Sequence, residues 1–398
     1  MMRNTGSSAQ YICIYATICG VTSLLALYGT MEHLNKGTSK QQISNSNNIV
    51  EADAVTDSDI ASQTTTMVDR DYHGVDFPMD TTLRAIDAKM QRVLENASAE
   101  LTNFGRHVTD WDKRKPSKQN SVLLVSSSHP RECENAHGDH VLLKSLKNKV
   151  DYCRLHGMEL YYNMDMLDDK MAGWWVKLFL IRMLMLERPD VEWILWMDSD
   201  AVFTNMTFKL PLEKYKEYNM VVQGSEESVY KQKSWLGLNS GVILLRNCQW
   251  SIDLLHEWAR FSPKGKIRDG AGALLSEAFP DRPQILEADD QCALIYLLLT
   301  QRSRWGPEVY LEHSYHLQGF FEVMTMYQST FPGMGLTWWP VITHFTGCQF
   351  CCGLPNTQYD VESCHRHMEL AYKVANNQVL HHSGYSYVSL QSSVVKHS

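Results

Sequence analysis

The chain has 398 residues, of which 44% are hydrophobic and 21% are charged, as is ordinary for a globular protein. A net charge of −8 and an isoelectric point near 6.0 argue against a nucleic-acid-binding protein. The length suffices for one large domain or two small ones. Eleven tryptophans fit a protein that handles carbohydrate, because indole rings stack on sugar faces, although a large core uses tryptophan too.

Residues 11–29, YICIYATICGVTSLLALYG, contain no charged side chain and approach the roughly 20 residues that span a bilayer. A cleaved signal peptide is the alternative, but the run has no good small-residue cleavage site directly after it, which favours an uncleaved anchor. Arg3 before it, and Lys36 and Lys40 after it, orient it only weakly. We predict a cytosolic tail over 1–10 and a transmembrane signal anchor over 11–29.

The stretch 30–81 is polar and rich in serine, threonine and asparagine. It cannot bury enough apolar surface to fold, so we predict a flexible stem. Tail, anchor, stem and a globular remainder over 82–398 form the layout of a type II membrane protein that faces a secretory lumen. Two N-glycosylation sequons, at Asn96 and Asn205, agree with this location.

Four of the ten cysteines crowd into a short C-terminal segment: Cys348, Cys351, Cys352 and Cys364. In a lumenal protein such a cluster is typical of disulfide bonds. Zinc binding is the alternative, because three histidines lie nearby: His344, His365 and His367. We expect disulfides here.

From residue 82 onward, the apolar pattern alternates between helical and extended spacing. We predict helices over 83–104, 139–157, 172–190, 251–261, 289–301 and 361–377. We predict strands over 121–128, 158–165, 191–197, 219–224, 241–247 and 340–347. The early strands and helices alternate, which indicates βαβ units and a mostly parallel, Rossmann-like sheet covered on both faces. Residues 82–398 are therefore expected to form one α/β domain with a less regular C-terminal part.

Two aspartates end the strand WILWM, in the triplet Asp198-Ser199-Asp200. Residues two apart in a strand point to the same side, so the two carboxylates are expected to converge. They stand where open α/β sheets bind ligands. Such close carboxylates repel unless a cation intervenes, and Mg²⁺ or Mn²⁺ bridging to a diphosphate is the economical solution. The segment lacks the third oxygen ligand and the glycine of an EF-hand. We predict the metal site of a nucleotide-sugar glycosyltransferase.

Several segments also resemble plant members of glycosyltransferase family 34, in family order: WMDSDAVFTNM, SWLGLNSGVILLRNCQWSIDLLHEWA, EADDQCALIYLL and HFTGCQFCCG. That family includes xyloglucan xylosyltransferases and galactomannan galactosyltransferases. The resemblance implies a GT-A-like fold, Mn²⁺, a UDP-sugar donor, a β-1,4-linked glycan acceptor and retention of anomeric configuration. It also implies a Golgi membrane location and homo- or hetero-oligomers with related enzymes.

Carried over position by position, the resemblance makes Asp198, Asp200 and His344 the metal ligands, and imidazole suits Mn²⁺ better than Mg²⁺. Ser199, like the two aspartates beside it, becomes a donor-binding residue, as do Asn239 and Gly241. Asn-Ser-Gly at 239–241 alternatively fits an ordinary turn before a strand.

Ser126 and Ser127, after the first predicted strand, are weaker candidates for contacts to uracil or ribose. Asp289, Asp290 and Gln291 match the family's polar triplet near the reacting carbon and are the catalytic candidates. As sequence alone, these three also fit an acidic helix N-terminus, which the helix dipole favours.

Gln291 carries no charge and is a poor nucleophile. We therefore expect front-face attack by the acceptor, on the side of the departing diphosphate, instead of a covalent intermediate.

Gln349, also assigned to the donor site, follows Cys348 where many relatives carry a lysine over the diphosphate. The HFTGCQ form favours UDP-galactose, whereas MAGWWVKL, PKGKIR and VYLE resemble the xylosyltransferase branch. We expect α-1,6 xylosyl transfer to a β-1,4-glucan in xyloglucan synthesis. The alternatives are a galactomannan α-1,6-galactosyltransferase and a catalytically weak scaffold subunit of a Golgi glycan-synthesising complex.

Overall fold

A computed structural model describes residues 80–101, 104, 119–165, 173–282, 287–322, 339–351 and 360–398. The predicted tail and anchor, and the stem up to residue 79, lie outside these ranges. Within them, no helix combines the length and the apolar composition that a membrane crossing requires.

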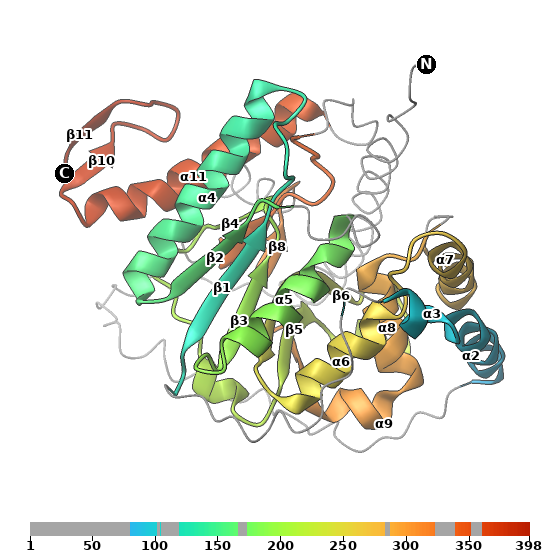
Figure 1. The fold of residues 1–398 in the computed structure, drawn as a ribbon. Coiled ribbons are helices and arrows are strands. Elements are labelled where there is room, and N and C mark those ends of the chain that lie inside the picture. Colours follow the sequence, from blue (N-terminus) through green and yellow to red (C-terminus); the bar gives the residue numbers. More distant parts are fainter. Residues whose placement is uncertain are drawn as a thin grey trace, which may run out of the picture.

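A six-stranded central sheet has the order β2-β1-β3-β6-β5-β7 (Figure 1). Its strands are β1 (Val122–Ser127), β2 (Glu159–Asn163), β3 (Trp193–Met197), β5 (Met220–Gly224), β6 (Leu238–Arg246) and β7 (Val309–Glu312). Strand β6 is antiparallel to both neighbours, and the other five strands run in one direction. The prediction of a mostly parallel sheet is therefore confirmed. The exception arises because β5 and β6 are joined without a crossover helix, as neighbouring antiparallel strands allow.

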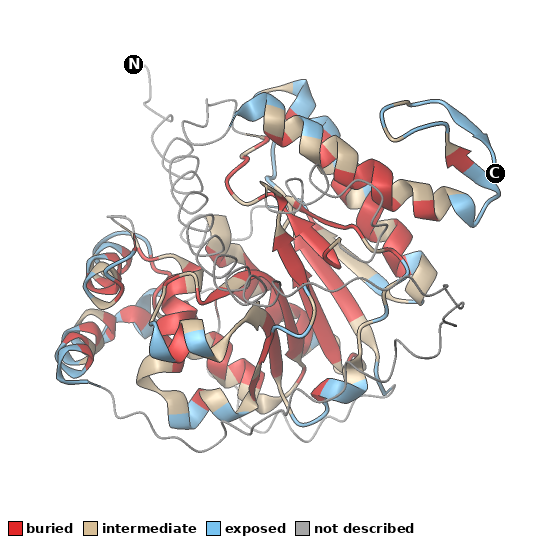
Figure 2. Ribbon diagram, turned by 180° about the vertical axis from the view of Figure 1, so that it is seen from behind, coloured by how far each residue is buried: buried red, intermediate tan, exposed pale blue. Residues whose placement is uncertain are grey.

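Helices cover both faces of this sheet, as predicted. On one face pack α5 (Val176–Glu187), α6 (Gln249–Ala259) and α8 (Asp290–Thr300). On the other lie α4 (Ala136–His156) and α11 (Val361–His381). Alternate residues of each strand enter the two cores: Ile194 and Trp196 face the first, and Leu195 faces the second. The strands are mostly buried (Figure 2), except for the edge strand β2, in which Asn163 alone is buried, as expected of a sheet covered on both sides.

A second, three-stranded sheet lies beyond the end of β3. It contains β4 (Ala201–Phe203), β9 (Ile342–His344) and β8 (Gln318–Phe320), in the order β4-β9-β8. Strand β9 is antiparallel to β4 and parallel to β8. The chain passes from the central sheet to this small sheet through residues 198–200, so the end of β3 is joined directly to a segment from the C-terminal part of the chain.

The N-terminal part of the predicted domain is helical but divided. Instead of one helix over 83–104, α2 (Thr81–Leu94) and α3 (Ala97–Glu100) are separated at Glu95 and Asn96. Helix α2 packs against α7 (Lys266–Ala278), a helix that the sequence pattern did not reveal. The Tyr296 hydroxyl donates to Asp87 of α2 at 2.7 Å. Helix α2 is thus part of the domain.

The remaining predicted elements form close to their expected bounds. Helix α4 ends at Gly157, which adopts the left-handed conformation and caps the helix with its N–H. The further elements are η4 (Gly173–Trp175), η5 (Leu212–Tyr215), η6 (Glu227–Lys231), α9 (Arg302–Trp305), η7 (Gly306–Glu308), β10 (Tyr385–Tyr387) and β11 (Val395–His397).

Two disulfides tie the C-terminal cysteine cluster to the domain. Cys348 bonds Cys364, and Cys351 bonds Cys133 in the loop after β1. The disulfide prediction is confirmed for three of the four clustered cysteines, and Cys352 lies outside the described residues. Among the described histidines, cysteines and acids, the one group arranged to hold a metal contains no cysteine. In the two sequons, Asn96 is exposed in the turn before α3, and Asn205 accepts from the Thr207 hydroxyl at 3.0 Å.

Candidate metal and donor site

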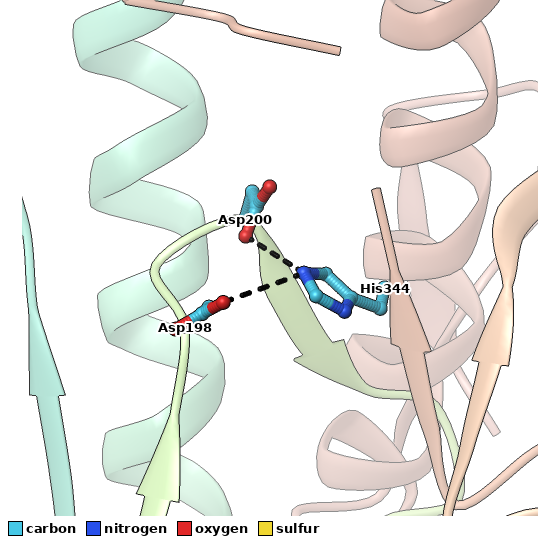
Figure 3. A group of neighbouring side chains, drawn as sticks. All are labelled: Asp198, Asp200 and His344. Atoms are coloured by element: carbon cyan, nitrogen blue, oxygen red, sulfur yellow. Dashed lines mark hydrogen bonds and ion pairs between the residues drawn. The ribbon is translucent and has the colours of Figure 1, made fainter. Parts of the chain in front are cut away.

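Asp198, Asp200 and His344 meet at the boundary between the two sheets (Figure 3). One ligand atom from each lies within 4.8 Å of the others. His344 Nε2 is 3.1 Å from Asp200 Oδ1 and 3.8 Å from Asp198 Oδ2. The imidazole is only 6% exposed, whereas the two carboxylates are 28% and 31% exposed. A buried imidazole thus faces two carboxylates that are open to solvent on one side.

The two aspartates converge for a different reason from the one predicted. They do not alternate along a strand, because residues 198–200 form a turn in which the Ala201 N–H donates to the Asp198 carbonyl at 3.2 Å. The next strand, β4, pairs with β9 in the register Ala201–His344. The Phe345 N–H donates to the Asp200 carbonyl at 3.0 Å. The turn, together with this strand pairing, places both carboxylates against the ring.

Helix α4 supports the turn from behind. The Ser145 hydroxyl donates to the Ser199 carbonyl at 2.6 Å, and Lys149 Nζ donates to the Ala201 carbonyl at 2.7 Å. Burial lowers the pKa of Lys149 to about 7, although the nearby Asp200 and Asp198 oppose the shift. Ser199, predicted to bind the donor, therefore uses its carbonyl to fix the turn.

Gly241 shapes the floor of the site. A methyl group built on it would lie 2.1 Å from His344 Cε1 and 2.9 Å from Asp198 Oδ2. Asn239, two residues earlier, accepts from the Gly241 N–H at 2.8 Å. Both belong to β6, so the alternative of a turn before a strand was wrong. Gly241 leaves no side chain against the ligand atoms, and the set of two carboxylates and one imidazole fits a divalent cation.

The charges around this group favour the ionised carboxylate and the protonated ring. Burial alone would raise the pKa of Asp200, but the adjacent His344 holds it below its ordinary value. Burial likewise would lower the pKa of His344, but Asp200 and Asp198 raise it. A cation bound here would take the place of the imidazole proton.

Lys177, on α5, joins the metal group to the catalytic candidates. Its Nζ lies 3.5 Å from Asp198 Oδ1 and 2.9 Å from Asp290 Oδ2, and donates to the Ser240 carbonyl at 3.0 Å. The lysine side chain is 2% exposed. Burial would lower its pKa, but the two carboxylates raise it, and the Ser240 hydroxyl also donates to Asp290 at 2.8 Å. Asp290 is therefore a buried partner of Lys177.

The other two members of the polar triplet lie beside Asp290 at the start of α8. Asp289 caps the helix by accepting a hydrogen bond from the Cys292 N–H at 2.7 Å. Its other carboxylate oxygen accepts from the Arg282 guanidinium at 2.8 Å. Gln291 donates to the Trp235 carbonyl at 3.0 Å and accepts from the Ser240 N–H at 3.4 Å. The structure thus brings the triplet against the residues that precede Gly241. The assignment of Asp289 to Gln291 as catalytic remains a prediction.

The remaining donor candidates lie at other positions. Ser126 is fully buried at the end of β1, and no described group accepts from or donates to its hydroxyl. Ser127 accepts from the Asn163 amide at 3.3 Å. Gln349 has a positive φ of 47° in the turn after β9. Among the described contacts, no hydrogen bond or ion pair joins these residues to the metal group, and their roles remain predictions.

Sequence reasoning missed three polar residues of this site: Lys149, Lys177 and Gln318. A lysine inside an apolar helix such as GWWVKLFL is a usable signal, because a buried ammonium needs acidic partners. Gln318 gave no such signal, since it belongs to a strand of only three residues, β8.

The galactosyl transferase GMA12/MNN10 family model, glycosyltransferase family 34, matches residues 118–354. "Xyloglucan 6-xylosyltransferase 1" of Arabidopsis thaliana is 48% identical over 76% of this chain and 70% of its own length. "Xyloglucan 6-xylosyltransferase 2" of the same plant is 48% identical over 75% and 66%. "Probable xyloglucan 6-xylosyltransferase 5" is 43% identical over 95% and 82%.

Among solved structures, a glycosyltransferase involved in glycosylation of the major capsid of PBCV-1 matches 63% of this chain and 99% of its own. The sequence identity is 13% and the TM-score 0.37, values too low to support an inference. The family model and the relatives suffice: the chain belongs to glycosyltransferase family 34.

Proposed function

We propose that this protein transfers xylose from UDP-xylose, in α-1,6 linkage, to a β-1,4-glucan during xyloglucan synthesis. The observation that carries the proposal is the group of Asp198, Asp200 and His344 in a chain 43–48% identical to xyloglucan 6-xylosyltransferases. The two half-exposed carboxylates can face a nucleotide diphosphate while the imidazole closes the buried side.

Mn²⁺ is the metal we propose for these three residues. Bound there, it would neutralise the negative charge that develops on the departing diphosphate. Lys177 faces Asp198 from the buried side, with its Nζ 3.5 Å from Oδ1. The Trp196 indole N–H donates to the same carboxylate at 2.6 Å. The protein thus holds Oδ1 of Asp198 in place, while Oδ2 faces His344.

Retention of configuration is proposed to follow the front-face route. Gln291 is held by the Trp235 carbonyl and the Ser240 N–H, so its neutral amide is a poor nucleophile but a well-positioned neighbour for the sugar. Asp290 is engaged by Lys177, and Asp289 by the helix terminus and Arg282. None of the three offers a carboxylate free of partners to attack the anomeric carbon.

A galactosyltransferase is the second candidate. It is favoured by Gln349, part of the HFTGCQ form, and by the description of the matching family model as a galactosyl transferase family. The test measures UDP release with Mn²⁺, comparing UDP-xylose with UDP-galactose on cello- and manno-oligosaccharides. We expect release from UDP-xylose with cello-oligosaccharide. Preference for UDP-galactose and a manno-oligosaccharide would establish the second candidate. If no UDP is released with any pair of donor and acceptor, the remaining candidate is the catalytically weak scaffold subunit.

We further propose a type II orientation in the Golgi membrane, with residues 11–29 as the anchor and the catalytic domain in the lumen. Both disulfides of the described chain support an oxidising compartment. The test expresses the full chain and extracts the membranes with alkaline carbonate. We expect the protein to stay in the membrane pellet and to lose mass on N-glycosidase digestion. Release into the supernatant would contradict a membrane anchor at residues 11–29.

A further inference from the structure

Gln318 is the first residue of β8 and lies next to the metal group although it carries no charge. The residue is 5% exposed. The amide bridges two residues of the site: Oε1 lies 3.1 Å from His344 Nδ1, and Nε2 donates to the Asn239 carbonyl at 3.0 Å. Strand β8 pairs in parallel with β9, which ends at His344. The glutamine therefore reaches the imidazole from the strand beside it.

The two contacts together define the orientation of the amide. A backbone carbonyl only accepts, so the Gln318 NH₂ must face Asn239 and the oxygen must face His344. An amide oxygen also only accepts, so His344 Nδ1 must carry a hydrogen. In the neutral ring the lone pair then lies on Nε2, the nitrogen that faces Asp200 and Asp198.

The position of the ring is constrained on a second side. Gly241 lies so close to the imidazole that even a methyl group would overlap Cε1 and Nδ1. This close packing opposes tilting of the ring towards β6, and Gln318 opposes its rotation by holding Nδ1. Metal-binding histidines commonly depend on such a partner for the second ring nitrogen.

We propose that Gln318 is a positioning residue that holds His344 in the tautomer and orientation needed to bind a divalent cation through Nε2. The inference rests on the metal-dependent transfer proposed above. By this inference, an uncharged residue determines that the cation is bound by a nitrogen ligand as well as by carboxylate oxygens. Without Gln318, the imidazole would no longer be held as a ligand, and the two carboxylates would be the main ligands left. A site of carboxylates alone discriminates less between Mn²⁺ and Mg²⁺.

The experiment measures Mn²⁺ binding to the full chain by the electron paramagnetic resonance signal of free Mn²⁺, with Mg²⁺ as competitor. Gln318→Leu removes the acceptor, and we expect Mn²⁺ affinity to fall about 10- to 100-fold while Mg²⁺ affinity changes less. Gln318→Glu restores an acceptor for Nδ1–H and should recover most of the Mn²⁺ affinity. If the leucine variant does not fold, Gln318→Met, which keeps the length of the side chain, replaces it with the same expected result.

Gln378→Leu is the matched control. Gln378 is also a buried bridging glutamine, accepting from the Met206 N–H and donating to the Thr204 carbonyl, but it lies on α11 and does not contact the metal group. We expect its loss to lower the melting temperature and leave the Mn²⁺ affinity and the Mn²⁺/Mg²⁺ ratio unchanged.

Three outcomes are decisive. Unchanged Mn²⁺ affinity in Gln318→Leu, with a wild-type chain that binds Mn²⁺, would overturn this inference and leave the proposed function in place. An equal loss in Gln318→Leu and Gln378→Leu would also overturn it, because the effect would be a general one. A wild-type chain that binds no Mn²⁺ would instead refute the metal site on which the proposed function depends.

Discussion

Gly241 and His344 are packed so closely that the glycine position has no room for a methyl group on the side of the imidazole ring. We predict that Gly241→Ala displaces the ring and lowers Mn²⁺ affinity about 10- to 100-fold, as loss of ligand positioning does elsewhere. Isothermal titration calorimetry with Mn²⁺ measures this affinity. Gly270→Ala is the control, because its added methyl group would meet only Val93 methyl groups at 3.2 and 3.4 Å. Wild-type affinity in Gly241→Ala would show that the ring has room to move.

Lys177 is predicted to be a large contributor to stability through Asp290. In Lys177→Met the carboxylate of Asp290 stays buried without its cation, so we expect the free energy of unfolding to fall by about 3–5 kcal/mol. Urea denaturation followed by tryptophan fluorescence measures this loss.

The double variant Lys177→Met/Asp290→Asn removes both charges and should recover part of the lost stability. If the double variant were less stable than Lys177→Met by the full cost of a second independent change, the two residues would not act as a pair.

Gln291 is predicted to act at the donor sugar and not in holding the fold. Gln291→Ala should reduce kcat about 10²-fold, the scale of misplacing a reacting group by about 1 Å, with a melting temperature near that of the wild type. UDP release under saturating donor measures kcat. Gln301→Ala, at the other end of α8, alters a contact to the Trp305 indole and should leave kcat unchanged. Near-normal turnover of Gln291→Ala would remove this residue from any role at the reacting carbon.

Glu312 is predicted to make stability depend on acid pH. Burial would raise its pKa, but hydrogen bonds from Ser314, Tyr215 and Lys214 hold it below the ordinary value of 4.5. A carboxylate with a lowered pKa contributes stability that is complete above the unfolded value and is lost as the pH falls through the folded value.

Glu312→Gln should therefore lower the free energy of unfolding by about 1–3 kcal/mol at neutral pH and reduce its slope against pH below 4.5. Denaturation curves at several pH values measure the slope. An unchanged slope would mean that other carboxylates account for acid unfolding.

The disulfide between Cys348 and Cys364 closes a short loop that contains Gln349, with a sequence separation of 16. Replacing both cysteines with alanine should cost about 3 kcal/mol of unfolding free energy by the loop-entropy relation. Thermal unfolding with and without reductant measures it. Reductant should lower the melting temperature of the variant less than that of the wild type; an equal shift in both would assign the effect to Cys133 and Cys351.

Periodicity predicted the central sheet well, because its strands are apolar on both faces and its helices are long. It missed β4, β7 and β8, since strands of three or four residues carry no usable period, and only Ile342–His344 of the strand predicted over 340–347 forms. It also missed α7, whose sequence KIRDGAGALLSEA contains two glycines, poor helix formers that are held here by packing against α2.

The site shows the same division. The triplet around Asp198 follows a strong strand signal, so its place at the sheet edge could be predicted, whereas His344 needed the family resemblance. The partners Lys177 and Gln318 depend on contacts across 113 and 26 positions, to Asp290 and His344 respectively, which no local pattern encodes. Asp289 shows that a motif residue also has an ordinary structural task, the capping of α8.

Asp200 and His344 are 144 positions apart in the chain, and they meet only through the pairing of β4 with β9. During synthesis both aspartates leave the ribosome long before the strand that carries the imidazole. A truncated or unfinished polypeptide therefore presents two carboxylates without their third ligand. The proposed metal site is therefore complete only after residue 344 has been made, even if the parallel strands have already assembled.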